Sequence, residues 1–295
     1  MSGYHQSVMT REVVAFLTRE GTRGGLVVDA TLGGGGHAEA ILRSREDTRV
    51  VGLDQDEDAI REASERLKEF GDRFRGAKLN FRRMDEALGA DRAEGVVMDI
   101  GVSSHQLDTA ERGFSFQRDG ALDMRMDRGG SLTAAQVVNE WKEEELAEIF
   151  WKWGEERHSR RIARAVADAR KHRAIRTTGE LAELVARVAG RGAWRLHPAT
   201  RVFQALRLVV NDEMGALREG LDKAWGCLAA GGRMVVISFH SLEDRMVKLR
   251  FRQWGGGEEA GIILTKKPRE PGEDEARENP RSRSAKMRAI EKIKI

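Results

Sequence analysis

Four aspartates recur where short apolar stretches of the sequence end. Asp29 ends "GLVVD", Asp54 ends "TRVVGLD", Asp85 ends the weaker stretch "AKLNFRRMD" (77–85), and Asp99 lies near the end of "AEGVVMDIG". Helical spacing between these β-branched stretches predicts parallel strands that alternate with helices. Because parallel strands direct their carboxyl ends to one edge of a sheet, we expect four carboxylates at that edge. Each of them alone could equally be a helix cap or a turn residue.

A run of four glycines follows the first of these stretches in "DATLGGGGHAEAIL". Strand, glycines and helix are the setting in which a loop binds a cofactor at a helix N-terminus. Gly33, Gly35 and Ala38 fit the dinucleotide pattern G-x-G-x-x-A, and Asp54 lies about twenty residues on, where an acid accepts ribose hydroxyls. The alternatives are a tight turn without ligand, a dinucleotide, and S-adenosylmethionine. Acids at the edge favour the last, because they repel a pyrophosphate and suit a sulfonium.

The composition limits the class of protein. The 295 residues include 51 basic and 48 acidic side chains, and arginines outnumber lysines roughly threefold, which suits phosphate contacts. Cys227 is the only cysteine, so we expect no internal disulfide and no Cys-rich zinc site, and the seven histidines show no metal-ligand spacing. The first residues contain no apolar run of signal-peptide type. We expect a cytoplasmic protein that binds neither metal nor membrane.

The pattern of elements predicts an interrupted domain. Residues 1–108 contain the alternating strands and helices, 109–196 begin with a polar loop and continue as helices, and 197–295 return to the sheet through a strand at 232–239. The middle segment therefore reads as an inserted helical substrate-recognition domain. The residues from Gly255 onward are rich in glycine and charge and are expected to form a basic C-terminal tail.

Eight blocks of this chain, in this order, resemble one family. They are "YHQSVM" (4–9), "DATLGGGGHAEAIL" (29–42), "VVMDIGVSSHQLD" (96–108), "ERGFSFQRDGALDMRMD" (111–127), "GEERHSRRIARAV" (154–166), "HPATRVFQALRLVVNDE" (197–213), "ISFHSLEDRMVK" (237–248) and "ENPRSRSAKMR" (278–288). The family is the bacterial ribosomal RNA small subunit methyltransferase H family, also called MraW. The resemblance implies a Rossmann-like class I methyltransferase, an α/β fold with a mainly parallel sheet and an inserted helical domain. It also implies S-adenosylmethionine-dependent N4-methylation of one cytidine in the decoding region of small-subunit (16S) ribosomal RNA, within an assembled or assembling subunit.

The resemblance also implies a set of cofactor residues. They are Gly35, Gly36, His37, Asp54, Asp85, Asp99 and Gln106. One departure is visible, because this chain has His105 where the family usually has proline in an "SSPQ" stretch. Loss of the fixed φ of proline is expected to loosen the loop that carries Gln106.

The predicted reaction requires a group that accepts a hydrogen bond from the cytosine amino group, whose lone pair is delocalised into the ring. We expect Asp99 to be this acceptor, with Ser103 and Ser104 contacting base or backbone. His240, in "SFHSLED", either faces the same edge or caps the turn at which it lies.

The predicted RNA contacts lie in the inserted segment. Arg160, Arg161 and Arg164 are candidates for phosphate contacts, with a plain solvated face as the alternative. Phe114 and Phe116 either stack on a splayed base or anchor their loop.

Two other functions are compatible with parts of the sequence. One is a non-enzymatic RNA-binding assembly factor, against which the intact glycine run argues, and the other is a Rossmann oxidoreductase, against which the acids argue. The oligomeric state stays open, with a homodimer among the alternatives.

Overall fold

The computed structural model describes residues 7–18, 24–190, 197–256 and 261–293. The chain divides into two compact units. The sheet unit comprises Met1–Gly101 and Met214–Ile295, and the helical unit comprises Val102–Glu213. The domain boundaries predicted at 109 and 196 both lie within the helical unit. Tyr4–Gln6 of the first motif and residues 191–196 of the predicted insertion lie outside the described residues.

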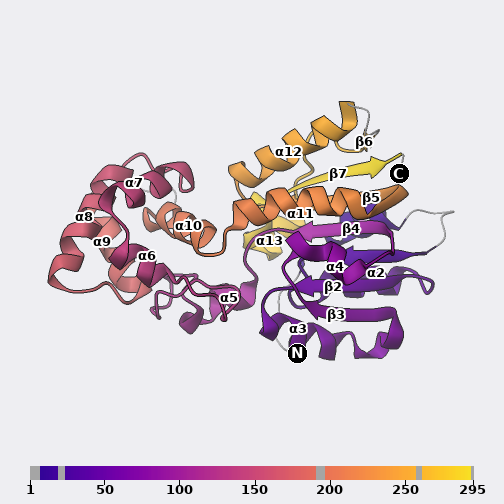
Figure 1. Cartoon of the computed structure of the whole chain (residues 1–295), viewed down its shortest axis with the longest axis horizontal. Helices are drawn as coiled ribbons and strands as arrows, with labels where there is room; N and C mark the ends of the chain where they lie inside the picture. Colours follow the sequence, from indigo (N-terminus) through magenta and orange to yellow (C-terminus); the bar gives the residue numbers. More distant parts are fainter. Residues whose placement is uncertain (1–6, 19–23, 191–196, 257–260, 294–295) are drawn as a thin grey trace. The chain divides into compact units, whose positions relative to one another are not determined.

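A seven-stranded sheet forms the centre of the sheet unit, in the order β3-β2-β1-β4-β5-β7-β6. The five strands β1 to β5 run parallel, and only β7, placed between β5 and β6, runs antiparallel to both. The predicted α/β fold with a mainly parallel sheet is confirmed (Figure 1). The strands are β1 (Leu26–Asp29), β2 (Arg49–Asp54), β3 (Phe74–Lys78), β4 (Ala93–Asp99), β5 (Leu228–Ser238), β6 (Gly261–Ile263) and β7 (Lys286–Lys292).

Helices cover both faces of this sheet. Successive side chains of a strand point to opposite faces, and because apolar side chains lie on both, each face packs against helices. Val27 is buried in one core with residues of α1, α2 and α3, whereas Val28 is buried in another core with residues of α4, α11 and α12. The helices of the sheet unit are α1 (Thr10–Leu17), α2 (Gly36–Ser44), α3 (Glu57–Arg66), α4 (Met84–Leu88), α11 (Glu213–Cys227), α12 (Ser241–Gly256) and α13 (Glu273–Glu278), with short 3₁₀ turns η1 (Lys68–Arg73), η2 (Phe81–Arg83) and η4 (Pro280–Ser284).

The predicted third strand, at 77–85, is wrong in its bounds. The strand β3 ends at Lys78, and the chain then turns at Asn80, whose Oδ1 accepts a hydrogen bond from Arg82 N at 3.1 Å and starts η2. The strand lies at the edge of the sheet and pairs only with β2, so its side chains are less buried and its apolar pattern is weaker.

The expected basic tail is also corrected by the structure. The residues that were expected to form it instead contribute β6, α13 and β7, and β7 pairs with β5 from Lys286↔Ser238 to Glu291↔Arg233. Met287 and Ala289 of β7 are buried in the core on one face, and Ile290 is buried on the other. The basic residues therefore alternate with core residues in a central strand.

The helical unit contains α5 (Ser104–Asp108), η3 (Ala110–Arg112), α6 (Ala134–Glu140), α7 (Glu143–Lys152), α8 (Ser159–His172), α9 (Thr178–Ala189) and α10 (Ala199–Val210). The helix α9 begins with a threonine cap, since Thr177 Oγ1 accepts a hydrogen bond from Glu180 N, and it ends before Gly190, which has φ of 80°. One face of α8 packs in the core through Ile162 and Val166.

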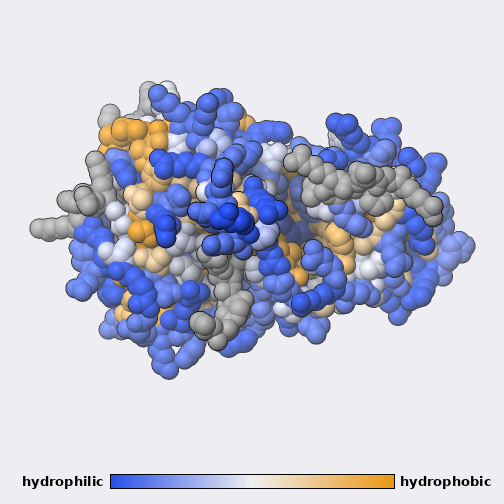
Figure 2. All heavy atoms as spheres, turned by 180° about the vertical axis from the view of Figure 1, so that it is seen from behind, coloured by the Kyte–Doolittle hydropathy of each residue, from blue (hydrophilic) through white to orange (hydrophobic). Residues whose placement is uncertain are grey.

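The face shown in Figure 2 is mainly hydrophilic and carries some hydrophobic patches. Within the described ranges of the chain, no helix combines the length and the apolar character needed to cross a membrane.

Candidate cofactor site and catalytic carboxylates

The glycine run forms a tight turn between β1 and α2. Gly33 and Gly35 have positive φ values of 49° and 79°, a conformation that side chains with a Cβ rarely adopt. Gly35 N donates to Leu32 O at 2.8 Å and closes the turn, and a Cβ on Gly36 would overlap the hydroxyl of Ser7. Glycine is therefore required here by backbone geometry and by close packing.

Asp54, at the end of β2, lies beside this turn. Its Oδ2 accepts a hydrogen bond from Gly33 N at 2.9 Å, and its Oδ1 accepts one from Asp56 N at 2.9 Å. Burial raises the pKa of Asp54 to about 6, and the charge of Asp56 adds to this rise. The two backbone donors fix the carboxylate at the carboxyl edge of the sheet, where each oxygen keeps a second lone pair for a ligand.

Asp29 and Asp99, at the ends of the neighbouring strands β1 and β4, lie close enough to interact. Thr31 connects them: its N–H donates to Asp29 Oδ1 at 3.3 Å, and its Oγ1 accepts from Asp99 N at 2.6 Å. Asp29 Oδ2 and Asp99 Oδ1 are buried and accept no hydrogen bond from any residue that the structure describes. Both oxygens keep an unused capacity to accept a hydrogen bond.

These acids form a group that we name the acid cluster, comprising Asp29, Asp54, Asp99, Glu243 and Glu275. Burial, assisted by the charge of Asp54, raises the pKa of Asp29 to about 7. Burial is also the main reason why the pKa of Asp99 lies well above its ordinary value, and the charges of Asp29, Glu243 and Glu275 raise it further. A cation placed among these carboxylates would relieve their repulsion.

His37, in the first turn of α2, faces Asp99. Its Nε2 lies 2.9 Å from Val8 O, and because a carbonyl can only accept, Nε2 carries the proton. Its Nδ1 lies 3.9 Å from Asp99 Oδ2. Next to Val8, Met9 N donates to Glu275 Oε1 at 2.7 Å. The segment before α1 is thus held between α2 and α13, next to the acid cluster.

His240 lies at the start of α12 in a compact cap with Glu243. Oε2 of Glu243 accepts hydrogen bonds from Phe239 N at 2.9 Å and from His240 N at 3.2 Å, and His240 Nε2 lies 3.0 Å from Glu243 Oε1. This arrangement agrees with the turn-capping alternative for His240. A direct part of His240 in the reaction stays a prediction.

Asp85 does not join the other aspartates, so the expectation of four carboxylates at matching strand ends is wrong for this residue. It lies in the first turn of α4 and forms an ion pair with Lys223 of α11, which lowers the pKa of Asp85. Its side chain is 41% exposed. The cause is the early end of β3, which places Asp85 on a helix.

Ser103 and Gln106 in the helical unit bind each other. Ser103 Oγ accepts from Gln106 N at 3.2 Å, and Gln106 Oε1 accepts from Ser103 N at 3.1 Å, which is a capping box at the start of α5. Ser104 and His105 are the first two residues of this helix. The capping box fixes the first turn of this helix, which contains His105 and Gln106.

The aromatic and basic candidates of the helical unit differ in exposure. Phe114 is only 6% exposed and belongs to the core, so the loop-anchor alternative applies to it and it offers no free face to a base. The ring of Phe116 lies against those of His197 and Phe203, with centroids 4.6 and 4.9 Å away. On α8, Arg160 is exposed, Arg161 donates to Val188 O, and Arg164 pairs with Glu143 while 76% exposed.

Comparison with known proteins identifies the family. A model described as the MraW methylase family matches residues 2–293. This chain belongs to the MraW methylase family.

Three similar relatives are each named "Ribosomal RNA small subunit methyltransferase H". The one from Carboxydothermus hydrogenoformans is 50% identical over 98% of both chains. The one from Symbiobacterium thermophilum is 47% identical over 99% of this chain and 98% of its own. The one from Nostoc punctiforme is 50% identical over 98% of this chain and 94% of its own.

The family resemblance seen in the sequence motifs is thereby confirmed. The chain is a methyltransferase, and its methyl donor is S-adenosylmethionine.

The residues at the edge of the sheet unit fit this cofactor. The sulfonium and the ammonium of S-adenosylmethionine are cations, and the acid cluster offers buried carboxylate oxygens of Asp29 and Asp99 without a donor among the described residues. Asp54 presents an oriented carboxylate of the kind that binds ribose hydroxyls. The turn at Gly33–Gly36 brings the backbone close to the same edge.

We expect the Asp54→Ala substitution to weaken binding of both S-adenosylmethionine and S-adenosylhomocysteine about 10- to 100-fold. Hydrogen bonds to a charged acceptor contribute roughly 1.5–3 kcal/mol. Isothermal titration calorimetry measures the change. Asp85→Ala is the matched control, since it removes an aspartate outside the acid cluster. Equal affinities of the two variants would place the ribose elsewhere.

Proposed function

We propose that this methyltransferase transfers the methyl group of S-adenosylmethionine to N4 of one cytidine in the decoding region of small-subunit ribosomal RNA. The relatives named "Ribosomal RNA small subunit methyltransferase H" support the substrate class. The observation that supports the chemistry is Asp99, whose buried Oδ1 accepts no hydrogen bond from the described residues. We propose an assembled or assembling small subunit as the form of the substrate.

The cytosine amino group is a poor nucleophile, because its lone pair is conjugated with the ring. When bound, S-adenosylmethionine would supply an electrophilic methyl group on a sulfonium; the methyl–sulfur bond would break, S-adenosylhomocysteine would leave, and the amino nitrogen would lose one proton. Asp99 accepts a hydrogen bond from the amino N–H, which localises the lone pair on nitrogen as the new bond forms. The raised pKa of Asp99, caused first by burial, makes its carboxylate a better acceptor than an ordinary aspartate. Ser103, Ser104 and His240 are the candidates for further contacts with the base.

Mass spectrometry of ribosomal RNA fragments tests this function. RNA from a deletion strain should lack one methyl group on a cytidine of the decoding region, and the parent gene should restore it. An Asp99→Asn gene should restore little of it. Loss of a methyl group from another nucleotide, or from a ring carbon, would contradict the proposal.

We propose that Arg160, Arg161 and Arg164 of α8 contact phosphates of the RNA. Replacing all three with alanine should weaken RNA binding and reduce the slope of log affinity against log salt by about 0.7–0.9 for each lost contact. Fluorescence anisotropy at several salt concentrations measures this slope. A control with the same charge change replaces Arg43, Arg61 and Arg83, which pair with acids of the sheet unit. Identical slopes in the two variants would return α8 to the solvated-face alternative.

A further inference from the structure

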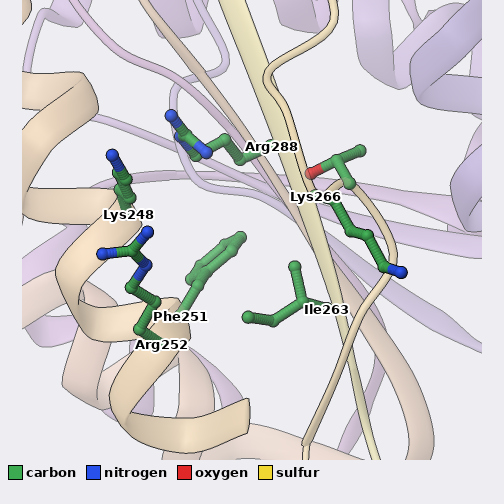
Figure 3. Close-up of a pocket in the computed structure, with 7 residues that line it drawn as sticks. Lys248, Phe251, Arg252, Ile263, Lys266 and Arg288 are labelled. Atoms are coloured by element: carbon green, nitrogen blue, oxygen red, sulfur yellow. The ribbon is translucent and has the colours of Figure 1, made fainter.

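A pocket lies in the sheet unit between α12, β6 and β7 and the segment that joins these strands. Its volume is about 250 Å³, and it is lined by Lys248, Phe251, Arg252, Ile263, Thr265, Lys266 and Arg288 (Figure 3). Pockets for whole cofactors and drug-sized ligands measure roughly 300–1,000 Å³. This pocket is therefore suited to a smaller group, such as a phosphate or a single base.

Four of the seven lining residues are basic. Arg288 is buried and forms a bidentate ion pair with Asp244, with Nε–Oδ1 at 2.6 Å and Nη2–Oδ2 at 3.1 Å. The side chains of Lys248, Arg252 and Lys266 make no hydrogen bond or ion pair with any other residue that the structure describes. One carboxylate thus neutralises one of four cations, and the excess positive charge favours an anion.

The floor of the pocket is apolar. Phe251 is 2% exposed overall and extends from α12 into the pocket, with Ile263 of β6 opposite to it (Figure 3). The charged ends of Lys248, Arg252 and Arg288 gather on one side of the Phe251 ring, while Lys266 points away from them. Cations beside an apolar surface suit the phosphate and the base of a nucleotide.

We propose that this pocket binds one nucleotide of a single-stranded segment of the ribosomal RNA substrate, distinct from the nucleotide that is methylated. Lys248 and Arg252 contact its phosphate, and the half-buried Ile263 contacts its base. The proposal rests on the substrate class of the proposed function. Lys248 follows Glu243 of the acid cluster by five residues, which is about 7.5 Å along α12. A strand bound near the acid cluster can therefore reach the pocket.

The Lys248→Ala/Arg252→Ala double variant tests the proposal. For single strands each neutralised phosphate contributes about 0.7 to the salt slope, so the loss of this one phosphate contact should lower the slope by about 0.7. At 0.15 M salt this corresponds to a roughly fourfold loss of affinity for RNA. Fluorescence anisotropy with a labelled single-stranded RNA of the decoding region measures both quantities. Both side chains have solvent-exposed surface, and a thermal melt verifies the fold.

The matched control is the Arg61→Ala/Lys68→Ala double variant. Both residues are largely exposed and belong to α3 and η1, beside the opposite edge of the sheet, and the two double variants lose the same charge. Equal salt slopes for the two variants would overturn the proposal. The proposal would be supported if millimolar adenosine monophosphate displaced the RNA from the parent but not from the pocket variant.

A different result would assign the pocket to a small anion and overturn the RNA proposal. In that case inorganic phosphate would bind to the parent and not to the pocket variant, while the slope of log RNA affinity against log salt would be the same in both. The methylation map separates this result from the proposed function. A methyl group on a different nucleotide contradicts the proposed function, whereas the salt slopes report only on the pocket.

Discussion

The Asp99→Asn variant is expected to methylate its RNA at least about 100-fold more slowly than the parent in single turnovers, at saturating cofactor and RNA. Asparagine keeps the shape and one acceptor oxygen, but it loses the negative charge that strengthens the hydrogen bond as positive charge develops on the amino nitrogen. One positioned polar group commonly contributes a factor of this size to the rate of the chemical step. RNA affinity should change little, because the contact strengthens only in the transition state.

The same variant must be titrated with cofactor, because Asp99 belongs to the acid cluster and lies 3.9 Å from Nδ1 of His37. Saturating both ligands separates a slower chemical step from weaker binding. Asp85→Asn is the matched control, and its rate should equal that of the parent, since Asp85 pairs with Lys223 on a helix. A normal rate in Asp99→Asn would transfer the role to Ser103, Ser104 or His240.

The sequence predicted the edge carboxylates where the strand pattern was strong. Asp29, Asp54 and Asp99 follow buried β-branched runs of inner strands, whose bounds are clear because both faces of each strand are covered. Asp85 follows an edge strand, where partial exposure weakens the pattern and lets the apolar residues of the next helix extend it. The one wrong member of the four is therefore the one next to the weakest strand.

Two members of the acid cluster had no recognised signal in the sequence. Glu243 follows His240 by three residues at the start of a helix, a capping-box spacing that could have indicated it. Glu275 meets Met9 across 266 residues, and no local pattern reports such a contact. The order of strands is also non-local, and it turns a basic C-terminal segment into the inner strand β7.

The ionisation of Asp29 and Asp54 is expected to raise the affinity for S-adenosylmethionine about 500-fold between pH 5 and pH 7. In the free protein the pKa of Asp29 is raised to about 7 and that of Asp54 to about 6, mainly by burial. A bound cation favours the ionised carboxylates, lowers their pKa and so releases protons. Each proton released on binding changes the affinity about tenfold per pH unit below the pKa of the free protein.

Calorimetry in two buffers of different ionisation enthalpy counts the protons released. S-adenosylhomocysteine lacks the sulfonium charge and should show a weaker dependence on pH. The Asp29→Asn variant should bind with a flatter profile between pH 6 and pH 7, because the carboxyl group whose pKa is raised to about 7 is gone. Equal affinity at pH 5 and pH 7, with no proton release, would show that the acid cluster does not hold the charged end of the cofactor.

The same raised pKa values determine how stability depends on pH without cofactor. A carboxyl group whose pKa is higher in the folded state than the value of about 3.9 in the unfolded state holds its proton longer when folded. The parent should therefore lose stability relative to the Asp29→Asn variant as the pH rises from 4 to 7. The quantity compared is the free energy of unfolding of each protein. Saturating S-adenosylmethionine should reverse that shift, because the cation stabilises the ionised carboxylate only in the folded protein. Chemical denaturation of both proteins at pH 5 and pH 7.5, with and without cofactor, measures the difference between their free energies of unfolding under all four conditions. If the cofactor leaves the change of this difference with pH unaltered, its cation does not contact Asp29 directly.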